Sequence, residues 1–538
     1  MAILVANIGT SDLAIKIDDY YIPISFDRNE PNLDLSNLEE EEEIIWSKDW
    51  RDSDIQRKLC PELGIEKYSF RELTKSIWDK YQEDEANWHD RISPGRIWGV
   101  IQTAIEEFQL DKVYVWVTDQ PEYIIDPITG ENKFNKGSLT DTVNLFEILN
   151  KWVSTEFEGL ELTPIVIPRN TLPIEQDKLL NLYYDFFANK LNEQSPILVS
   201  VKGGTPQMQT ALRMQGFSAS TNKILLIDPQ LSLNQLLNGQ PSECQFTSYW
   251  RYTRNQKFNE VKNLLEKRWD FSGAIAILEE WQESLSFSFK YTKNKDLQTD
   301  QELVSRMIKT LQIADHCFNL DVESAKKIWY KNVSSNNQLK KQLNPNMVQQ
   351  IETYSSLLNV YTQCRIYEHL VQTANFLTCL SSFYEGVLFK IAKKFNKERE
   401  FEAKVDRGGG NYTHKNRYDK IDFVENLIKK EGKQQEKEAW SKVLEILKSL
   451  DFWCTQRNQL IHKSQGVSLE IMNKMYQKEV EKGNNVCSPQ NIIDNLTFIL
   501  ESELNIVHSK YQEFVGKNAK YYIYSAVRDW VSKAFTSS

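Results

Sequence analysis

The spacing of hydrophobic positions changes along the chain and divides it into two parts. Before about residue 235, short apolar runs rich in β-branched side chains alternate with helical segments. The runs that predict buried strands lie at residues 2–8, 113–118, 164–168, 197–201 and 223–228. Continuous apolar strands separated by helices are typical of a parallel sheet covered on both faces. We therefore predict an α/β domain at residues 1–237, with a hairpin where DLAIKI and YYIPISF flank Asp18-Asp19.

After this domain the strand patterns nearly disappear. Apolar residues recur every three and four positions in 258–281, 302–320, 348–395 and 435–465, which is the period of amphipathic helices. We therefore predict a linker at 238–257 and an α-helical region at 258–538. Within it, residues 393–420 are rich in Lys and Arg, contain three consecutive glycines, and are predicted to form a basic loop.

Composition narrows the class of protein. A chain of 538 residues is too long for a single core. Its formal net charge of −10 argues against a broad surface that coats duplex nucleic acid, although a local basic groove remains compatible. Seven scattered cysteines without a CxxC pair indicate a reduced, cytoplasmic protein, and no apolar run is long enough for a membrane span.

The most informative stretch is SPILVSVKGGTPQMQTALRMQGF, residues 195–217. A strand runs into Lys202, Gly203 and Gly204, and Thr205-Pro206 then opens a helical pattern. Thr caps a helix through its hydroxyl, and Pro is tolerated at the first helical position. Backbone N–H groups at such a helix start face any anion in the turn. The pattern favours a phosphate site, and a tight connection without ligand is the alternative.

The carboxyl ends of the other predicted strands are also small and polar. They read Asn7 to Asp12, Thr118 to Gln120 and Arg169 to Thr171. In an open α/β sheet, ligands bind at these ends near the point where the strand order reverses. The dinucleotide fingerprint GxGxxG is missing, and NKGSLT at 135–140 is not a Walker A motif. These strand ends are rich in hydrogen-bond donors and lack a cluster of carboxylates or His. They therefore suit a nucleotide phosphate or the polar edge of a base, and we expect no bound metal.

A second candidate site lies in a helix predicted from Glu438 to Gly466. Arg457, Asn458 and His462 fall near its end, and Arg457 and His462 are roughly 140° apart on an ideal helix. The two side chains therefore suit a groove between two helices, such as a two-fold dimer would form. Arg would stabilise charge on a phosphorane-like transition state, and His would transfer protons during attack by an RNA 2′-OH. Asn458 would bind the phosphate or orient the His. A similar pair, Arg407 and His414, lies in the glycine-rich loop.

Three motifs occur together: NIGTSDLAIKIDDYYIPISF at the start, VKGGTPQMQTAL after a central strand, and RNQLIH in the helical part. In this order they resemble the CARF–HEPN ribonucleases of type III CRISPR systems, over essentially the whole chain. RNQLIH matches the Arg-x(4–6)-His pattern of HEPN nucleases. The resemblance implies an α/β, Rossmann-like CARF domain followed by an all-α HEPN domain.

The resemblance further implies a cytoplasmic homodimer that binds cyclic oligoadenylate, with four or six adenylates, between its CARF domains. It implies metal-independent cleavage of single-stranded RNA by Arg457, Asn458 and His462 from both protomers. Some members also cleave their own activator by 2′-OH attack, for which Thr10 and Ser11 are the candidates here. The residues that match the binding loops are Gly9, Thr10, Ser11, Asp12, Thr118, Asp119, Gln120, Lys202, Gly203, Gly204, Thr205, Pro206, Gln207 and Met208.

Two further roles come from the residues and not from the resemblance. The helices of 258–395 would couple the two sites, and the loop at 393–420 would guide RNA, with Tyr412 or Tyr418 stacking on bases. The rival hypothesis is a nucleotide-sensing interaction protein with an inactive helical dimerisation module. A metal-dependent nuclease is disfavoured because the six His form no ligand spacing. The role of residues 30–100, a lid or an outer helical layer, stays open.

Overall fold

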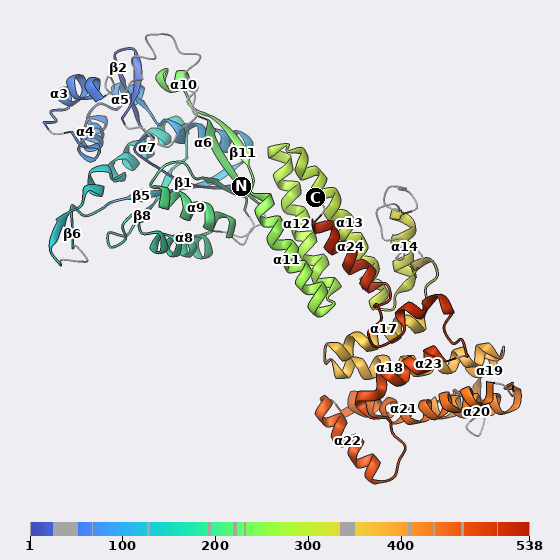
Figure 1. Cartoon of the computed structure of the whole chain (residues 1–538). Helices are drawn as coiled ribbons and strands as arrows, with labels where there is room; N and C mark the ends of the chain where they lie inside the picture. The colour runs from blue at the N-terminus through green and yellow to red at the C-terminus, as the bar shows by residue number, and fades with distance from the viewer. Residues whose placement is uncertain are drawn as a thin grey trace. The chain divides into compact units, whose positions relative to one another are not determined.

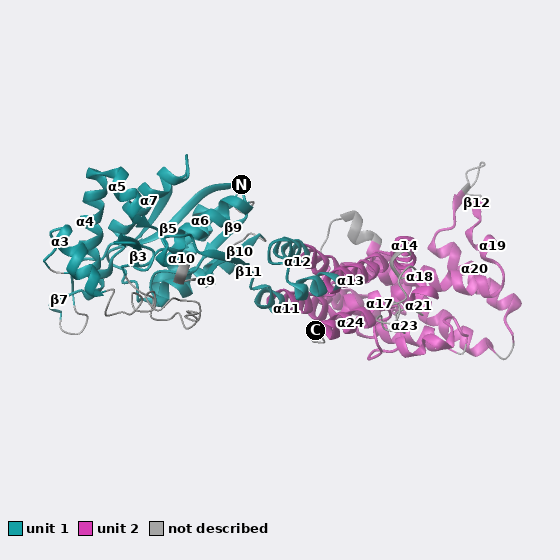
Figure 2. Cartoon of the chain, turned by 90° about the horizontal axis from the view of Figure 1, so that it is seen from above, with its two compact units in different colours: residues 1–255, 280–302 teal, residues 256–279, 303–538 magenta. Residues whose placement is uncertain are grey.

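The structure is a computed structural model of the whole chain (Figure 1). It describes residues 2–24, 52–66, 68–125, 130–191, 195–218, 223–230, 233–333, 350–406, 412–433, 436–463, 467–502 and 504–536. The chain forms two compact units, residues 1–255 with 280–302 and residues 256–279 with 303–538 (Figure 2).

The first unit is built on a six-stranded sheet with strand order β11-β10-β9-β1-β5-β8. All neighbours pair in parallel except β11, which runs antiparallel to β10. The strands are β1 Ala2–Asn7, β5 Leu110–Thr118, β8 Leu162–Ile167, β9 Ile197–Ser200, β10 Ile224–Gln230 and β11 Glu243–Thr247. The five apolar runs thus form strands as predicted. The stretch expected as a linker, 238–257, contains β11 and the start of α11.

Helices cover both faces of this sheet. They are α4 Phe70–Glu83, α5 Glu85–Arg91, α6 Arg96–Glu107, α7 Val143–Glu156, α8 Gln176–Lys190, α9 Pro206–Ser218 and α10 Leu233–Leu237, with shorter turns η1 Ile55–Leu59, α3 Cys60–Glu62 and η2 Lys136–Thr140. The predicted hairpin is present as β2 Ala14–Ile17 and β3 Tyr20–Pro23, joined by β4 Ile92–Ser93. A second hairpin follows β5, with strands β6 Tyr123–Ile125 and β7 Asn132–Phe134.

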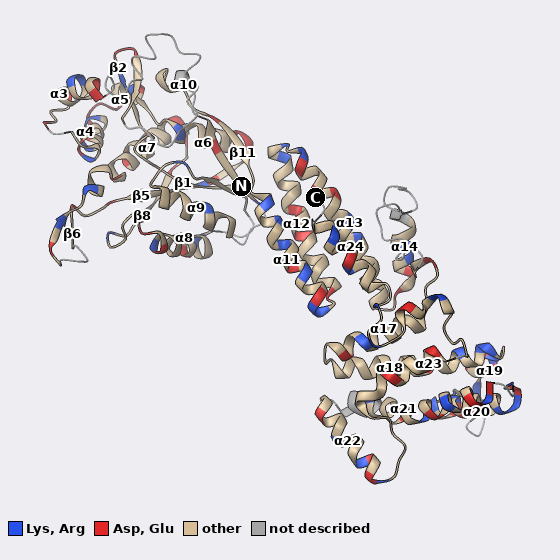
Figure 3. Cartoon of the chain, in the orientation of Figure 1, with Lys and Arg blue, Asp and Glu red and all other residues tan. Residues whose placement is uncertain are grey.

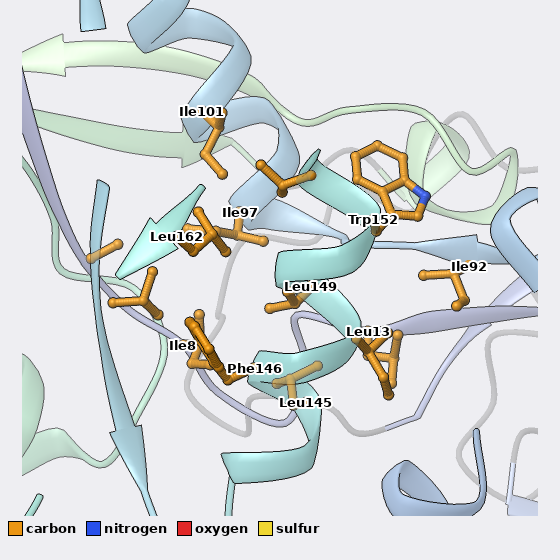
Figure 4. Packing of buried hydrophobic residues seen from close by; sticks show 14 of the residues in the cluster. Ile8, Leu13, Ile92, Ile97, Ile101, Leu145, Phe146, Leu149, Trp152 and Leu162 are labelled. Atoms are coloured by element: carbon orange, nitrogen blue, oxygen red, sulfur yellow. The ribbon is translucent and has the colours of Figure 1, made fainter. Parts of the chain in front are cut away.

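Alternate residues of β1 enter two different cores, which explains its continuous apolar sequence. Leu4 and Ala6 pack in a cluster with side chains of α4, α6 and α7. Figure 4 shows part of this cluster, with Ile97 of α6 and Leu149 of α7. Ile3 and Val5 pack in the other cluster, with side chains of α8 and α9. The described residues of 52–91 supply buried side chains to the first cluster and so pack as helices on this core. Residues 30–51 lie outside the described residues.

The remaining chain is almost entirely helical. Three helices are divided in sequence between the units: α11 Trp250–Arg268, α12 Phe271–Thr292 and α13 Lys295–Phe318. The second unit continues with α14 Val322–Val333, α17 Ser356–His369, α18 Thr373–Lys394, α19 Glu398–Glu402, α20 Arg417–Glu431, α21 Lys437–Lys463, α22 Leu469–Glu481, η4 Pro489–Asn491, α23 Ile492–Glu501, η5 Ser509–Phe514 and α24 Tyr524–Thr536. Helix α18 packs against α17, α20 and α21.

One prediction for this unit is wrong. Residues 393–420, expected as a loop, contain the end of α18, helix α19, a hairpin of β12 Lys404–Asp406 and β13 Tyr412–His414, and the start of α20. The hairpin was missed because its strands are three residues long and polar, so they lack the apolar alternation of a half-buried strand. Arg407 lies outside the described residues.

The sequence predicted reduced cysteines and no membrane span. All seven cysteines are free thiols. Among the helices in the described ranges, none is both long and apolar enough to cross a bilayer.

Candidate functional site

A cavity of about 440 Å³ lies at the carboxyl ends of β1, β5, β8 and β9. The strand order reverses at β1, because the chain goes from β1 to β5 and β8 and then returns to β9 on the other side. This is the position where open α/β sheets bind ligands. The lining residues are Ile8, Gly9, Thr10, Thr118, Gln120, Asn135, Gly137, Thr140, Asp141, Thr142, Leu172, Pro173, Ile174, Gly204, Thr205 and Met208.

Glycines allow two loops of the cavity to touch through their backbones. A Cβ on Gly9 would lie 2.8 Å from the backbone nitrogen of Gly204, and one on Gly203 would lie 2.8 Å from the carbonyl oxygen of Asn7. Gly203 and Gly204 also have φ values of +91° and +71°, a region that favours glycine. At Gly9 and Gly203 an added Cβ would require the backbone to move, so these two glycines fix the shape of this wall.

Helix α9 begins at the cavity as the sequence predicted. Thr205 Oγ1 accepts a hydrogen bond from the backbone N–H of Met208 at 3.2 Å, and Pro206 is the first helical residue. The hydroxyl of Thr205 donates to the carbonyl of Pro173, which joins the helix start to the segment after β8. The N-terminus of α9, with its dipole and backbone N–H groups, therefore borders the cavity.

The sequence-predicted binding residues divide into two groups of equal size. Those that line the cavity are Gly9, Thr10, Thr118, Gln120, Gly204, Thr205 and Met208. Those outside its lining are Ser11, Asp12, Asp119, Lys202, Gly203, Pro206 and Gln207. Each charged residue in the second group has an ion-pair partner.

Ser11 and Asp12 contact Arg96 of α6. The guanidinium of Arg96 donates to Ser11 Oγ, and its Nε lies 3.3 Å from Asp12 Oδ1. Asp12 Oδ2 also accepts from the backbone N–H of Gly9 at 2.8 Å. The side chains of Arg96 and Asp12 are only 3% and 4% exposed, so this is a buried ion pair that holds the loop after β1. Thr10 is the polar side chain of this loop that lines the cavity.

Asp119 and Lys202 are held by surface ion pairs. Asp119 lies between two arginines, with Arg71 Nη2 at 3.2 Å and Arg169 Nη2 at 2.7 Å. Lys202 Nζ lies 3.7 Å from Asp228 Oδ1. Arg169, which follows the third predicted strand, is therefore engaged with the loop after β5.

Sequence reasoning missed the second wall of the cavity. The chain leaves β5 at Thr118, forms the β6–β7 hairpin and η2, and returns at Thr142, whose backbone N–H donates to the carbonyl of Thr118 at 3.2 Å. This excursion supplies Asn135, Gly137, Thr140, Asp141 and Thr142. The small, polar run NKGSLTDT at 135–142 could have indicated this wall. It includes the segment 135–140, which we considered only as a Walker A motif and rejected.

Asp141 is the ionisable side chain of this missed wall. It is 1% exposed, and its Oδ2 accepts from the backbone N–H of Gln120 at 2.6 Å and from Arg71 Nη1 at 3.2 Å. Burial raises the pKa of its carboxyl from 3.8 to about 6, although both hydrogen-bond donors act in the opposite direction. The cavity thus contains a carboxyl group that changes charge near neutral pH.

In the second unit, Arg457, Asn458 and His462 all lie in α21. Arg457 is half-buried, and the side chains of Asn458 and His462 lie outside the described residues. The turn before Arg457 is fixed by packing, since Trp453 and Cys454 are fully buried and Trp453 Nε1 donates to the carbonyl of Cys487 at 2.8 Å. A well-anchored helix therefore carries the candidate catalytic residues.

Arg417, at the start of α20, also contacts this part of α21. Its Nε lies 2.5 Å from Asp451 Oδ1, and its Nη2 donates to Thr455 Oγ1 at 2.5 Å. Tyr418 beside it is 56% exposed. Lysines and arginines on α19 and α20 alternate with acidic residues (Figure 3), and Lys415 and Lys420 contact Glu400 and Glu385. Much of the basic charge in 393–420 is therefore used within the fold.

Neither candidate site contains a metal-type cluster in the described ranges. No group of three or more His, Cys, Asp or Glu side chains there is placed to hold an ion.

Comparison with known proteins returned a structural likeness alone. No protein-family model and no curated protein matches the sequence. A solved structure of Enterococcus italicus Csm6 bound to cyclic hexa-2'-fluoro-hexa-dAMP matches with 14% sequence identity and a TM-score of 0.44. The match covers 80% of this chain and 95% of that one. Identity and TM-score are both low, so the function proposed below rests on the cavity and on α21.

Proposed function

We propose that this protein is a CRISPR-associated endoribonuclease of the CARF–HEPN class, activated by cyclic oligoadenylate and active on single-stranded RNA. The cavity at the reversal of the strand order carries this proposal. It combines a glycine turn, the N-terminus of α9 and polar strand ends in one hollow. Such a combination suits a phosphodiester ligand, because free N–H groups and the helix dipole stabilise phosphate oxygens.

The second unit would supply the chemistry. RNA cleavage by its own 2′-OH needs charge stabilisation and proton transfer but no covalent enzyme intermediate. Arg457 would stabilise the pentavalent transition state, His462 would move a proton, and Asn458 would bind the phosphate or orient the His. Two copies of α21 in a homodimer would form one composite site.

Activation would be a shift between two arrangements of that dimer. A ligand shifts such an equilibrium only if it binds one arrangement more tightly. Cyclic oligoadenylate shared between two first units would do so, and the helices of 258–395 would carry the change to α21. We keep degradation of the activator as part of the proposal, with Thr10 in the cavity wall. Ser11 is the weaker of the two candidates because Arg96 holds its hydroxyl.

The test is cleavage of a fluorescent single-stranded RNA in EDTA. Cyclic tetra-adenylate, cyclic hexa-adenylate or buffer is added to wild type, to His462→Ala and to His369→Ala, an exposed histidine at the end of α17. One ring size should trigger cleavage in wild type and His369→Ala, while His462→Ala loses about 10²–10⁴-fold of the rate. Activity that needs added metal, or that survives in His462→Ala, would refute the proposed mechanism.

A nucleotide sensor with an inactive helical module is the second candidate. It predicts measurable binding of a cyclic oligoadenylate together with no RNA cleavage in the same assay. The polar, buried lining of the cavity is common to both candidates, so binding alone does not separate them.

A further inference from the structure

The cavity has two walls of different chemistry. One wall consists of Gly204, Thr205 and the N-terminus of α9, whose helix dipole favours negative charge. The other wall contains Gln120 and Asp141, whose side-chain oxygens are hydrogen-bond acceptors. We propose that Asp141 and Gln120 bind the amino group on the six-membered ring of an adenine base, and that Asp141 makes the pocket selective for adenine. This inference rests on the proposed function and names the part of the activator that each wall binds.

The carboxyl group of Asp141 is held through its Oδ2, which accepts hydrogen bonds from the backbone N–H of Gln120 and from Arg71 Nη1. The side chain of Thr118 also hydrogen-bonds this carboxyl group. These donors fix the plane and the direction of the carboxyl group. Its Oδ1 accepts neither the Gln120 nor the Arg71 hydrogen bond, and it belongs to a side chain that lines the cavity.

Gln120 provides the second acceptor. Its Nε2 donates to the carbonyl of Thr171 at 3.3 Å, which sets the orientation of the amide. Its Oε1 is buried and has no hydrogen-bond partner within the described chain. A buried acceptor without a donor is unfavourable for the empty protein, and a donor brought by a ligand would relieve this cost. The side chain is 1% exposed and also lines the cavity.

Charge excludes a phosphate from this wall. No Lys, Arg or His is among the described residues that line the cavity, and Asp141 is the one carboxylate among them. Arg71 pairs with Asp119 and Asp141, Arg169 pairs with Asp119, and neither arginine is among the lining residues. An anion next to the Asp141 carboxylate would be repelled, whereas a neutral base would not.

The apolar part of the lining also suits a base. Leu172, Pro173 and Ile174 form an apolar stretch of the lining, with Met208 from α9. Ligand sites commonly combine such apolar surface with a few polar groups that fix the orientation of the ligand. The apolar stretch would contact the faces of the ring, and the two acceptors would read its edge.

An exocyclic amino group has two hydrogens, and this wall has two acceptors. Adenine therefore pairs with both Asp141 Oδ1 and Gln120 Oε1. Hypoxanthine carries a carbonyl oxygen at the same ring position, which would face two acceptors and be repelled. The difference predicts a preference for cyclic oligoadenylate over the matching cyclic oligo-inosinate of about ten-fold or more.

Asp141→Asn should reverse part of this preference. The donors Gln120 N–H and Arg71 would hold the oxygen of the new amide, which places its NH₂ where Oδ1 was. An NH₂ at this position donates to the oxygen of hypoxanthine and no longer accepts from adenine. The exposed Asp185→Asn on α8 removes one negative charge without touching the cavity and is the matched control.

The experiment measures affinities of the full-length protein for cyclic tetra- and hexa-adenylate and for their inosine counterparts, by calorimetry. Wild type and Asp185→Asn should prefer adenine. Asp141→Asn should lose most of the preference for adenine rings over inosine rings, because it binds adenine more weakly and inosine more tightly. Gln120→Met, which removes one acceptor without changing charge, should weaken adenine binding and gain nothing for inosine; it serves as the second test if Asp141→Asn does not fold.

Three results would overturn the inference. Equal affinity of wild type for adenine and inosine rings would do so, as would an equal loss for both rings in Asp141→Asn, which indicates a structural role alone. No binding of either adenylate ring to wild type would remove the proposed function and the inference with it. Binding of the adenylate ring without discrimination leaves the proposed function intact and rejects only the role of Asp141.

Discussion

The buried ion pair between Arg96 and Asp12 gives the sharpest stability prediction. Replacing Arg96 with Met leaves the Asp12 carboxylate in a site where the two side chains are 3% and 4% exposed. Removing one partner of a buried pair costs about 3–5 kcal/mol. Asp12 keeps the hydrogen bond from the Gly9 backbone, so we expect the lower end, about 3 kcal/mol, or a hundred-fold in the unfolding equilibrium.

Hydrogen exchange of the full-length protein, followed by mass spectrometry, measures this change within one unit. Peptides from β1 that exchange through unfolding should lose about a hundred-fold of their protection in Arg96→Met. The double variant Arg96→Met/Asp12→Asn should recover most of it, because no uncompensated charge remains.

The control is an ion pair with a shorter distance whose side chains are mostly exposed to water. Arg251 Nη2 lies 2.6 Å from Asp296 Oδ2, and the two side chains are 74% and 60% exposed. Because solvent screens such pairs, Arg251→Met should change stability by less than about 1 kcal/mol. The reasoning is refuted if Arg96→Met changes protection by less than the control does, or if the double variant is no better than the single one.

Three further predictions concern the cavity and α21. Gly203→Ala places a Cβ 2.8 Å from the carbonyl oxygen of Asn7 at a φ of +91°, and should cost about 2 kcal/mol or more, seen as a lower melting temperature and weaker ligand binding. The pKa of Asp141, raised to about 6, means that its contribution to stability is present below pH 3.8 and is lost as pH rises through 6. The loss is about 3 kcal/mol, so melting temperatures measured from pH 4 to 8 should fall more in wild type than in Asp141→Asn, and parallel curves would contradict this. Arg417 contacts Asp451 and Thr455 in the part of α21 that precedes Arg457, so we expect it to position that part of the helix. Arg417→Met should lower kcat for RNA by about ten-fold or more with unchanged binding of cyclic oligoadenylate, and a change in KM alone would contradict this.

The central strands of the sheet, such as β1 and β9, were predictable because they are buried on both faces. Continuous apolar runs such as 197–201 have few alternatives, and both faces of β1 are indeed covered. Strand β11 was missed because it is an edge strand whose residues are half-exposed, so its sequence, ECQFT, lacks such a run. The β12–β13 hairpin was missed for a similar reason, because its short, polar strands also lack an apolar run.

The cavity was only half predictable. The rule that ligands bind at strand ends correctly directed attention to the loops after β1, β5 and β9. It could not separate Thr10, which lines the cavity, from Ser11 and Asp12, because their contacts with Arg96 join residues far apart in sequence. Asp141 was invisible for a related reason: it reaches the cavity through an excursion that starts and ends at the hydrogen-bonded pair Thr118 and Thr142.

The central position of β1 also has a consequence for the order of folding. Its residue Ile3 pairs with Ile197 of β9, so the wall of the cavity where Gly9 meets Gly204 cannot form until β9 has left the ribosome. At about 5–20 residues per second, the first strand waits roughly 10–40 s after its own synthesis for this partner. During that interval one edge of an apolar strand is open to other chains. A nascent chain should therefore depend on chaperones until residue 200 is exposed, and the cavity at the strand ends is among the last features of this unit to be completed.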